Sequence, residues 1–201
     1  MSRVFFALPV SGNARKAVAD IAARASRDFD EIRWVPAANY HLTLKFLGEV
    51  PSAELDAVRE AVGLIPAGFP ALPISFDCLD FFGPPRLPRV LFVRGERGGE
   101  AEKTYARLAL SLEEAVRGWC KPEERPFRAH LTLGRFRMPR PGERISAANE
   151  KAIRALASGK LEYAKFSPIE SRADRIVLYE SSFTREGVSY SEIAFWPLAG
   201  G

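Results

Sequence analysis

The tetrapeptide His-Leu-Thr-Leu occurs twice in this chain, at residues 41–44 and again at residues 130–133. The chain has only two histidines, and each one begins a copy. In a β-strand, successive side chains point to opposite faces, so the His and Thr of each copy share one face and the leucines share the other. We therefore expect two strands that each bury a leucine face and present His and Thr to a cleft or to solvent.

The length and composition describe an ordinary globular protein. A chain of 201 residues with 47% hydrophobic residues can form one large domain, or two small lobes with a shared core. No apolar run approaches the ~18 residues of a membrane span, and residues 1–9 lack the layout of a signal peptide. Cys78 and Cys120 show no metal-ligand spacing, and Cys78 is expected to be a small buried residue. We expect a cytoplasmic protein.

Positive charge gathers around the second tetrapeptide. The net charge of the whole chain is +4. Residues 121–144 alone hold seven basic and three acidic residues, a local excess that is also 7 − 3 = +4. Such a segment would attract a ligand that carries phosphate, although a solvated arginine-rich loop is an equal alternative on charge alone.

The hydrophobic pattern predicts helices and strands in irregular succession. Apolar residues at helical spacing predict helices at residues 14–29, 52–65, 100–118 and 146–157. Alternating or continuous apolar runs predict strands at residues 3–8, 40–47, 74–78, 89–94, 128–136, 161–166, 175–182 and 188–196, with a short segment at 32–35.

Turn residues set the boundaries between these elements. Gly48 and Pro51 are expected to end the strand that begins at Tyr40, and residues 95–99 and 184–187 to form turns, the second within a closing hairpin. Because several strands follow one another through short turns, we expect an α+β fold with antiparallel or mixed sheets rather than a doubly wound parallel sheet.

Two facing strands of this kind would bring together the groups that phosphodiester cleavage needs. One histidine can take a proton from the nucleophile while the other protonates the leaving oxygen, because the ordinary imidazole pKa of about 6.5 suits both roles. The threonine hydroxyls can donate to the phosphate oxygens as negative charge grows on them. The two copies are identical, so the residues alone do not decide which histidine is the acid.

Other interpretations of the histidines are weaker. A single histidine on a strand is usually structural, but two in the same tetrapeptide, with no third in the chain, argue against that. A zinc site would need further ligands, and no cysteine or carboxylate cluster accompanies them. The chain also lacks a Gly-x-Ser-x-Gly elbow and the glycine loops of nucleotide-binding proteins.

The two tetrapeptides and the residues around them resemble the 2H phosphoesterase superfamily, which is named for its paired His-x-Thr/Ser-x motifs. Within it, the chain is most similar to the RNA 2′,3′-cyclic phosphodiesterases, also called 2′-5′ RNA ligases. The resemblance extends over nearly the whole chain, in the opening strand at 3–9, the motif blocks at 39–49 and 126–135, the central strand at 89–93, and the closing hairpin at 178–183 with Tyr190.

The resemblance implies a fold and a set of roles. It implies one bilobal domain over residues 1–201, with two pseudo-symmetric lobes, each an antiparallel sheet with helices on its outer face. One lobe is centred on each motif, and the active cleft lies between the lobes. His41 would be the proton donor and His130 the proton acceptor, with Thr43 and Thr132 holding the phosphate.

Arg135 matches a frequent arginine of the family and would also bind substrate. By strict alternation from His130, however, its side chain belongs on the buried face. It reaches the phosphate only if the strand bends at Gly134, and otherwise it is a structural arginine.

The expected activity is hydrolysis of the cyclic phosphate at an RNA end, or of small cyclic nucleotides, to a 2′-phosphomonoester, by a monomer without metal or other cofactor. Joining RNA halves through a 2′-5′ bond without ATP is an alternative, as is a module that binds nucleotide or RNA without turnover. Aromatic and arginine side chains would hold the RNA, and the candidates are Phe46, Phe82, Phe127, Phe136, Arg86 and Arg128.

Overall fold

The computed structural model describes residues 1–95, 98–140, 143–184 and 187–200. The strands are β1 (Ser2–Pro9), β2 (Ile32–Trp34), β3 (His41–Val50), β4 (Leu72–Phe82), β5 (Val90–Gly95), β6 (His130–Phe136), β7 (Lys165–Ala173), β8 (Arg175–Thr184) and β9 (Gly187–Pro197). The α-helices are α1 (Gly12–Ala25), α2 (Leu55–Val62), α3 (Glu100–Ala115) and α4 (Ala147–Ala157).

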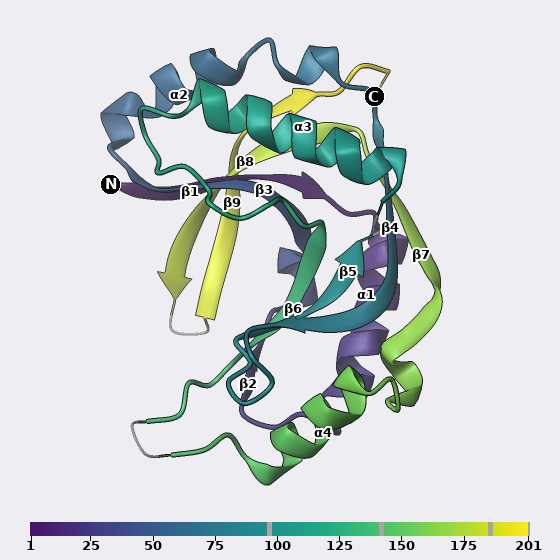
Figure 1. The fold of residues 1–201 in the computed structure, drawn as a ribbon. Coiled ribbons are helices and arrows are strands. Elements are labelled where there is room, and N and C mark those ends of the chain that lie inside the picture. The colour runs from purple at the N-terminus through teal and green to yellow at the C-terminus, as the bar shows by residue number, and fades with distance from the viewer. Residues whose placement is uncertain (96–97, 141–142, 185–186, 201) are drawn as a thin grey trace.

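The strands form two antiparallel sheets, one for each motif. The first sheet has the order β3-β1-β8-β9 and contains the first motif, while the second has the order β2-β6-β5-β4-β7 and contains the second motif. The expected α+β fold with two antiparallel sheets is therefore confirmed. The chain passes repeatedly between the sheets, so the first sheet combines strands from both ends of the chain (Figure 1).

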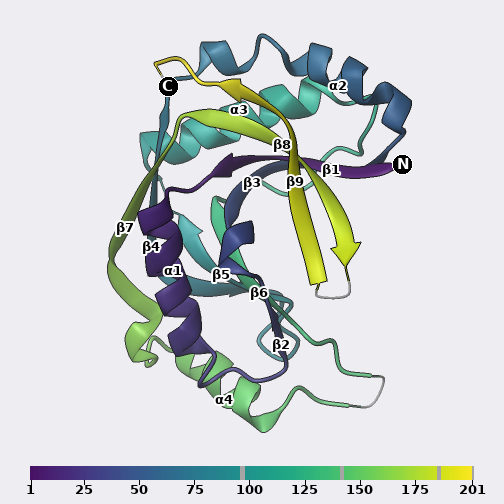
Figure 2. The same ribbon diagram turned by 180° about the vertical axis from the view of Figure 1, so that it is seen from behind.

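Helices cover one face of each sheet and leave the other face to the motifs. Helices α2 and α3 lie over the first sheet, and α1 and α4 lie over the second, as both views show (Figures 1 and 2). We call the helix-free face of each sheet its inner face. The helices bury apolar stripes against the strands, and each fully buried Val, Leu or Phe side chain contributes about 1.5–3 kcal/mol.

Side-chain caps fix where two of these helices begin. The Ser11 hydroxyl accepts from the Ala14 backbone N–H at the start of α1, and the Ser146 hydroxyl accepts from that of Asn149 at the start of α4. Such a cap satisfies a backbone N–H that has no partner inside the helix. Both helices therefore start close to the positions that the sequence predicts.

Three helices end earlier than their apolar patterns predict. The first ends at Ala25 rather than residue 29, because the chain turns at residues 26–28 and carries Phe29 into the core from outside the helix. The helix predicted over residues 52–65 contains only Leu55–Val62 as α-helix. The helix predicted to reach residue 118 ends at Ala115. In each case, apolar residues beyond the last turn still pack against the core.

The first motif strand continues past the glycine that was expected to end it. Strand β3 runs to Val50, and Gly48 lies inside it with a positive φ of 81°. Glycine adopts this conformation without steric strain, so it permits an irregular strand rather than ending one. The pairing with β1 shifts at this point, and only Pro51 stops the strand.

The strand predicted at residues 161–166 is placed wrongly. Residues 162–164 form a 3₁₀ turn, and β7 runs from Lys165 to Ala173. Pro168 lies inside this strand, although proline is normally absent from the central strands of a sheet. It is accommodated because β7 is the edge of the second sheet, so one side of its backbone needs no partner.

The closing hairpin is confirmed by the pairing of β8 with β9. Its predicted turn at residues 184–187 includes 185–186, which lie outside the described residues, as do 96–97 of the predicted turn at 95–99.

Candidate active site

Both copies of the tetrapeptide lie on strands with the predicted division of faces. The motif leucines are almost fully buried, with Leu42, Leu131 and Leu133 at 0% exposure and Leu44 at 5%. The histidines and threonines are half-buried on the inner faces. The leucines thus fix each strand against its helices, and the His/Thr face is held on a rigid element.

Each motif strand carries a β-bulge directly after its threonine. In the first, Thr43 pairs with Ala7 and Lys45 pairs with Phe6, so Leu44 is an extra residue. In the second, Thr132 pairs with Phe92 and Gly134 with Leu91, so Leu133 is extra. A bulge places two successive residues opposite one and changes the alternation of faces beyond it.

The bulge determines where Arg135 points. Strict alternation puts this residue on the buried face, but beyond the extra Leu133 it is exposed and paired with Arg33 of β2. Its charge lowers the pKa of His130, so the guanidinium lies near that imidazole on the inner face. The bend that the sequence reasoning required is therefore present, one residue before Gly134.

The bulge at Leu44 has the same effect on the first strand, where it exposes Phe46. This side chain is 56% exposed and lies 5.4 Å from the Phe5 ring, which in turn lies 4.9 Å from the His41 ring. Phe46 and Arg135 are therefore equivalent positions, each five residues after its histidine and each on the inner face.

The backbone orients both imidazoles in the same way. His41 Nδ1–H donates to the carbonyl oxygen of Asn39, and His130 Nδ1–H donates to that of Arg128, each over 2.7 Å. A carbonyl only accepts, so Nδ1 carries the proton in the neutral ring and Nε2 is left with a lone pair. The Asn39 side chain also donates to the Val188 carbonyl of β9 over 2.8 Å, which anchors the segment that holds His41.

Aromatic rings surround each histidine. Tyr190 and Tyr179 of the closing hairpin lie 5.3 and 5.9 Å from His41 between ring centroids. Phe82 and Phe92 lie 4.9 and 5.3 Å from His130. These rings exclude water from the imidazoles and thereby disfavour their charged forms.

The pKa values of both histidines are lowered. Burial lowers the pKa of His41 to about 4, against a raising effect of the Asn39 hydrogen bond, and the His130 charge lowers it further. Burial also lowers the pKa of His130, against the Arg128 hydrogen bond, and the Arg135 charge adds to the lowering. Both rings are therefore neutral near pH 7 without a ligand, and they lie close enough for their charges to interact.

The threonine hydroxyls differ in their contacts. Thr43 Oγ1 lies 3.0 Å from His41 Nε2, so in the neutral ring the hydroxyl donates to the nitrogen lone pair. Thr132 pairs with Phe92 on the inner face of the second sheet, and Phe92 is one of the two aromatic rings beside His130. Both hydroxyls thus accompany their histidines on the inner faces.

Of the other predicted contacts, only some lie at this site. Phe82 lies beside His130, whereas Phe136 is buried against Phe29 and Phe127 packs on the core. Phe136 is therefore structural, because its ring lies in the core, whereas the partly buried Phe127 stays a candidate for holding RNA. The Arg86 side chain is exposed in the loop between β4 and β5, and Arg128 contributes its carbonyl to His130.

The basic segment is partly neutralised by ion pairs. Arg125 pairs with Glu123 over 3.1 Å, and Arg137 pairs with Glu31 over 3.2 Å. Arg135 makes no ion pair with a described residue. Arg128 likewise forms no ion pair with a described residue, so the positive field that the charge count predicts is reduced but remains around the second motif.

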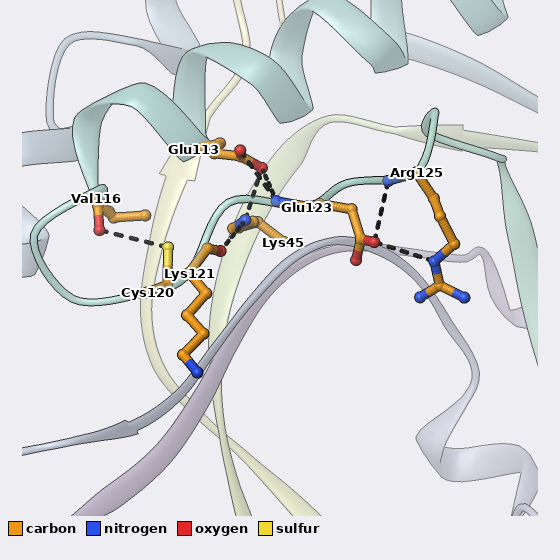
Figure 3. Close-up of polar contacts among 7 residues, drawn as sticks. All are labelled: Lys45, Glu113, Val116, Cys120, Lys121, Glu123 and Arg125. Carbon is orange, nitrogen blue, oxygen red and sulfur yellow. Dashed lines mark hydrogen bonds and ion pairs between the residues drawn. The ribbon is translucent and has the colours of Figure 1, made fainter.

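A buried ion pair joins the first motif strand to the segment that leads into the second (Figure 3). Lys45, 6% exposed, donates to Glu113 of α3 over 2.6 Å and to the Lys121 carbonyl over 3.1 Å. The Glu123 backbone N–H donates to the same carboxylate over 3.2 Å. Sequence reasoning missed this network, because a lysine in an alternating strand gives no sign that its charge is buried.

Among the residues that the structure describes, no group of three or more His, Cys, Asp or Glu side chains could hold a metal ion. No helix within the described ranges is long and apolar enough to cross a membrane.

Comparison with known proteins identifies the family. A sequence model of the LigT-like phosphoesterases matches residues 8–92. The chain is 27% identical over 200 residues to an RNA 2′,3′-cyclic phosphodiesterase of Thermotoga maritima, covering 99% of this chain and 97% of the relative. It is 32% identical over 139 residues to one of Archaeoglobus fulgidus, covering 69% of this chain and 75% of the relative.

A solved structure has a similar fold. The crystal structure of E. coli LigT complexed with 3′-AMP superimposes with a TM-score of 0.70 at 25% identity, over 98% of both chains. The fold and the paired motifs define a two-lobed phosphoesterase of the 2H superfamily. Within that class, the chain belongs to the family of LigT-like phosphoesterases.

Proposed function

We propose that this protein hydrolyses the 2′,3′-cyclic phosphate at RNA ends to a 2′-phosphomonoester by two-histidine general acid–base catalysis. One observation carries the proposal. Two histidines on separate sheets have Nδ1 tied to a backbone carbonyl and Nε2 directed away from it, and they lie close enough for their charges to interact. The names of the relatives, RNA 2′,3′-cyclic phosphodiesterases, support the choice of substrate.

His130 acts as the general base. Its neutral ring has a free lone pair on Nε2, which takes a proton from water as the water oxygen attacks phosphorus. Burial keeps the pKa of His130 low, and the neighbouring Arg135 charge lowers it further, so the ring is neutral when the substrate arrives. The new bond is the one between phosphorus and the water oxygen.

His41 acts as the general acid. It gives its Nε2 proton to the 3′ oxygen as the bond from phosphorus to that oxygen breaks, which leaves a 3′ hydroxyl and a 2′ phosphate. The pKa of about 4 in the free protein would leave this ring unprotonated at pH 7. A bound phosphate supplies a nearby negative charge, which raises the pKa and loads the proton.

Thr43, Thr132 and Arg135 hold the phosphate. The Thr43 hydroxyl is already aimed at His41 Nε2, so an oxygen of a phosphate bound there would lie within its reach. Donors fixed in this way stabilise charge that develops in the transition state. Arg135 adds a permanent positive charge on the side of the base.

The reaction needs no metal or other cofactor in this scheme, and residues 1–201 work as one bilobal domain, as a monomer. The test is incubation with a nucleoside 2′,3′-cyclic phosphate in EDTA, with a 3′,5′-cyclic nucleotide as control substrate and ³¹P NMR as the readout. We expect the 2′-monophosphate as the only product and no turnover of the control. Formation of the 3′-monophosphate, or turnover only after metal is added, would contradict the proposal.

A further inference from the structure

A basic and aromatic row crosses the inner face of the first sheet beside the histidine. Arg3 of β1 pairs with Ser181 of β8, and Ser181 pairs with Tyr190 of β9. Residues opposite one another in neighbouring strands share a face. Arg3 also lies two residues before Phe5, whose ring contacts His41, so the row lies on the same face as the proposed acid.

A second basic row lies on the inner face of the other sheet. Arg33 of β2 pairs with Arg135 of β6. Ile32 and Phe136, the next pair along, lie on the core side, so alternation directs both arginines inward. The row begins at Arg135, near His130, and reaches the edge of the second sheet at Arg33, because β2 is the edge strand of that sheet.

The two rows meet at Tyr190. Burial raises the pKa of this hydroxyl, and the charges of Arg135 and Arg3 both act in the opposite direction. The hydroxyl therefore lies near one guanidinium from each sheet. The Tyr190 ring also meets His41 edge-on, at 5.3 Å and 82°, so Tyr190 joins the surroundings of His41 to the two arginines.

These arginines have no acidic partner among the described residues. Neither Arg3 nor Arg33 forms an ion pair there, although Glu49 is the cross-strand neighbour of Arg3. By contrast, Arg94, Arg137 and Arg175 on the same two sheets or directly beside them all have carboxylate partners. Unpaired arginines on a sheet face that also carries aromatic rings are suited to an anionic nucleic-acid backbone.

We propose that Arg3 and Tyr190, with Arg33 on the opposite sheet, form a second anion site that binds the phosphodiester on the 5′ side of the terminal nucleotide. This inference rests on the proposed function, because it takes the space between His41 and His130 as the place of the cyclic phosphate. The next charge along an RNA strand is then the 5′ phosphodiester. The site favours RNA ends over cyclic mononucleotides that lack a 5′ phosphate.

A binding experiment isolates this site from catalysis. A nucleoside 3′-monophosphate and the matching 3′,5′-bisphosphate differ only in the 5′ phosphate, and calorimetry gives both affinities. We expect the wild type to bind the bisphosphate about tenfold more tightly, an advantage that shrinks as salt rises. Arg3→Gln should reduce the advantage to about twofold and leave the affinity for the monophosphate unchanged.

The matched control is Arg27→Gln, which removes the same charge from an exposed position just after α1. It should leave both affinities as in the wild type. Tyr190→Phe keeps the ring against His41 and removes only the hydroxyl, and it should weaken bisphosphate binding alone. Equal affinity of the wild type for the two ligands, or equal effects of Arg3→Gln and Arg27→Gln, would overturn the second site.

Turnover then separates the two proposals. We expect Arg3→Gln to lower kcat/KM for a dinucleotide that ends in a 2′,3′-cyclic phosphate by about tenfold, while kcat/KM for the cyclic mononucleotide stays within about twofold. If the wild type hydrolyses both substrates and Arg3→Gln affects neither, the second site is wrong and the proposed function stands. If the wild type hydrolyses neither, both proposals fail.

Discussion

The two motif strands repeat one local geometry. Each runs through His-Leu-Thr-Leu, each has a bulge at the second leucine, and each holds the histidine Nδ1–H on a carbonyl two residues earlier over 2.7 Å. The equivalence extends to the burial of the leucines and the half-exposure of the histidines. The same four residues on a similar sheet thus produce the same presentation of an imidazole.

The strands differ in the two residues after the bulge. The first has Lys45 and then Phe46, and the second has Gly134 and then Arg135. On the helix side, Lys45 extends to Glu113, whereas Gly134 admits the backbone of β2. On the inner face, the position five residues after the histidine holds an aromatic ring in the first strand and a cation in the second. Equal motifs therefore acquire unequal surroundings, which supports the proposed division of the two histidines into an acid and a base.

Removing either histidine should have the largest effect on activity. We expect His41→Ala and His130→Ala each to lower kcat by about 10²–10⁴, because each loses one proton transfer. The pH–rate profiles distinguish the two: His41→Ala should lose the alkaline limb, where the acid deprotonates, and His130→Ala the acidic limb, where the base protonates. Circular dichroism checks that both variants fold. Loss of the same limb in both would break the proposed division of roles.

Neutralising the partner of Lys45 tests the network that only the first strand has. Glu113→Gln leaves a buried ammonium without a carboxylate, and we expect a loss of about 3 kcal/mol in the free energy of unfolding by urea. Glu114→Gln, at the exposed neighbouring position of α3, is the matched control and should change stability by less than about 0.5 kcal/mol. Similar losses in the two variants would mean that the ion pair has no special role.

Adding one carbon at Gly134 tests the close approach that only the second strand has. A Cβ there would overlap Ile32 Cγ2 and would meet the Arg33 carbonyl oxygen at 3.1 Å. We expect Gly134→Ala to destabilise the protein by about 1–3 kcal/mol, and Ile32→Ala in the same chain to recover part of that relative to the sum of the single changes. Gly118→Ala, where a Cβ meets nothing within 4 Å, is the control.

The smallest expected effect is on the pH dependence of stability. The pKa of His41 falls from about 6.5 in the unfolded chain to about 4 in the folded one. The unfolded chain therefore binds more protons between these values, and the free energy of unfolding decreases as pH falls through that window. Because the ring is half-buried, we expect roughly 1–2 kcal/mol, measured as the difference between the wild type and His41→Gln.

NMR of the imidazole signals sharpens the same comparison. The chain has two histidines, so its own imidazoles give two resonance sets that the single variants assign. We expect both pKa values below 6.5 in the free protein, and a rise of the His41 value when inorganic phosphate is added. A His41 pKa at or above 6.5 without phosphate would show that burial does not control this ring.

Local pattern was enough to predict most of the elements and the faces of the motif strands. The leucines of both copies are buried and the histidines are not, as a period of two requires. Helix starts at Ser11 and Ser146 also follow from local capping chemistry. Errors arose where a boundary depends on a distant partner, as with Pro168, which is tolerated only because β7 is an edge strand.

The sequence by itself determined that two strands would present a histidine and a threonine opposite a buried leucine face, because side-chain alternation is a property of the strand alone. It could not determine the direction of Arg135 or the burial of Lys45. A bulge exists only relative to the neighbouring strand, and a buried charge is tolerated only where another element supplies its partner. Tertiary structure therefore decided how two identical tetrapeptides came to have different neighbours.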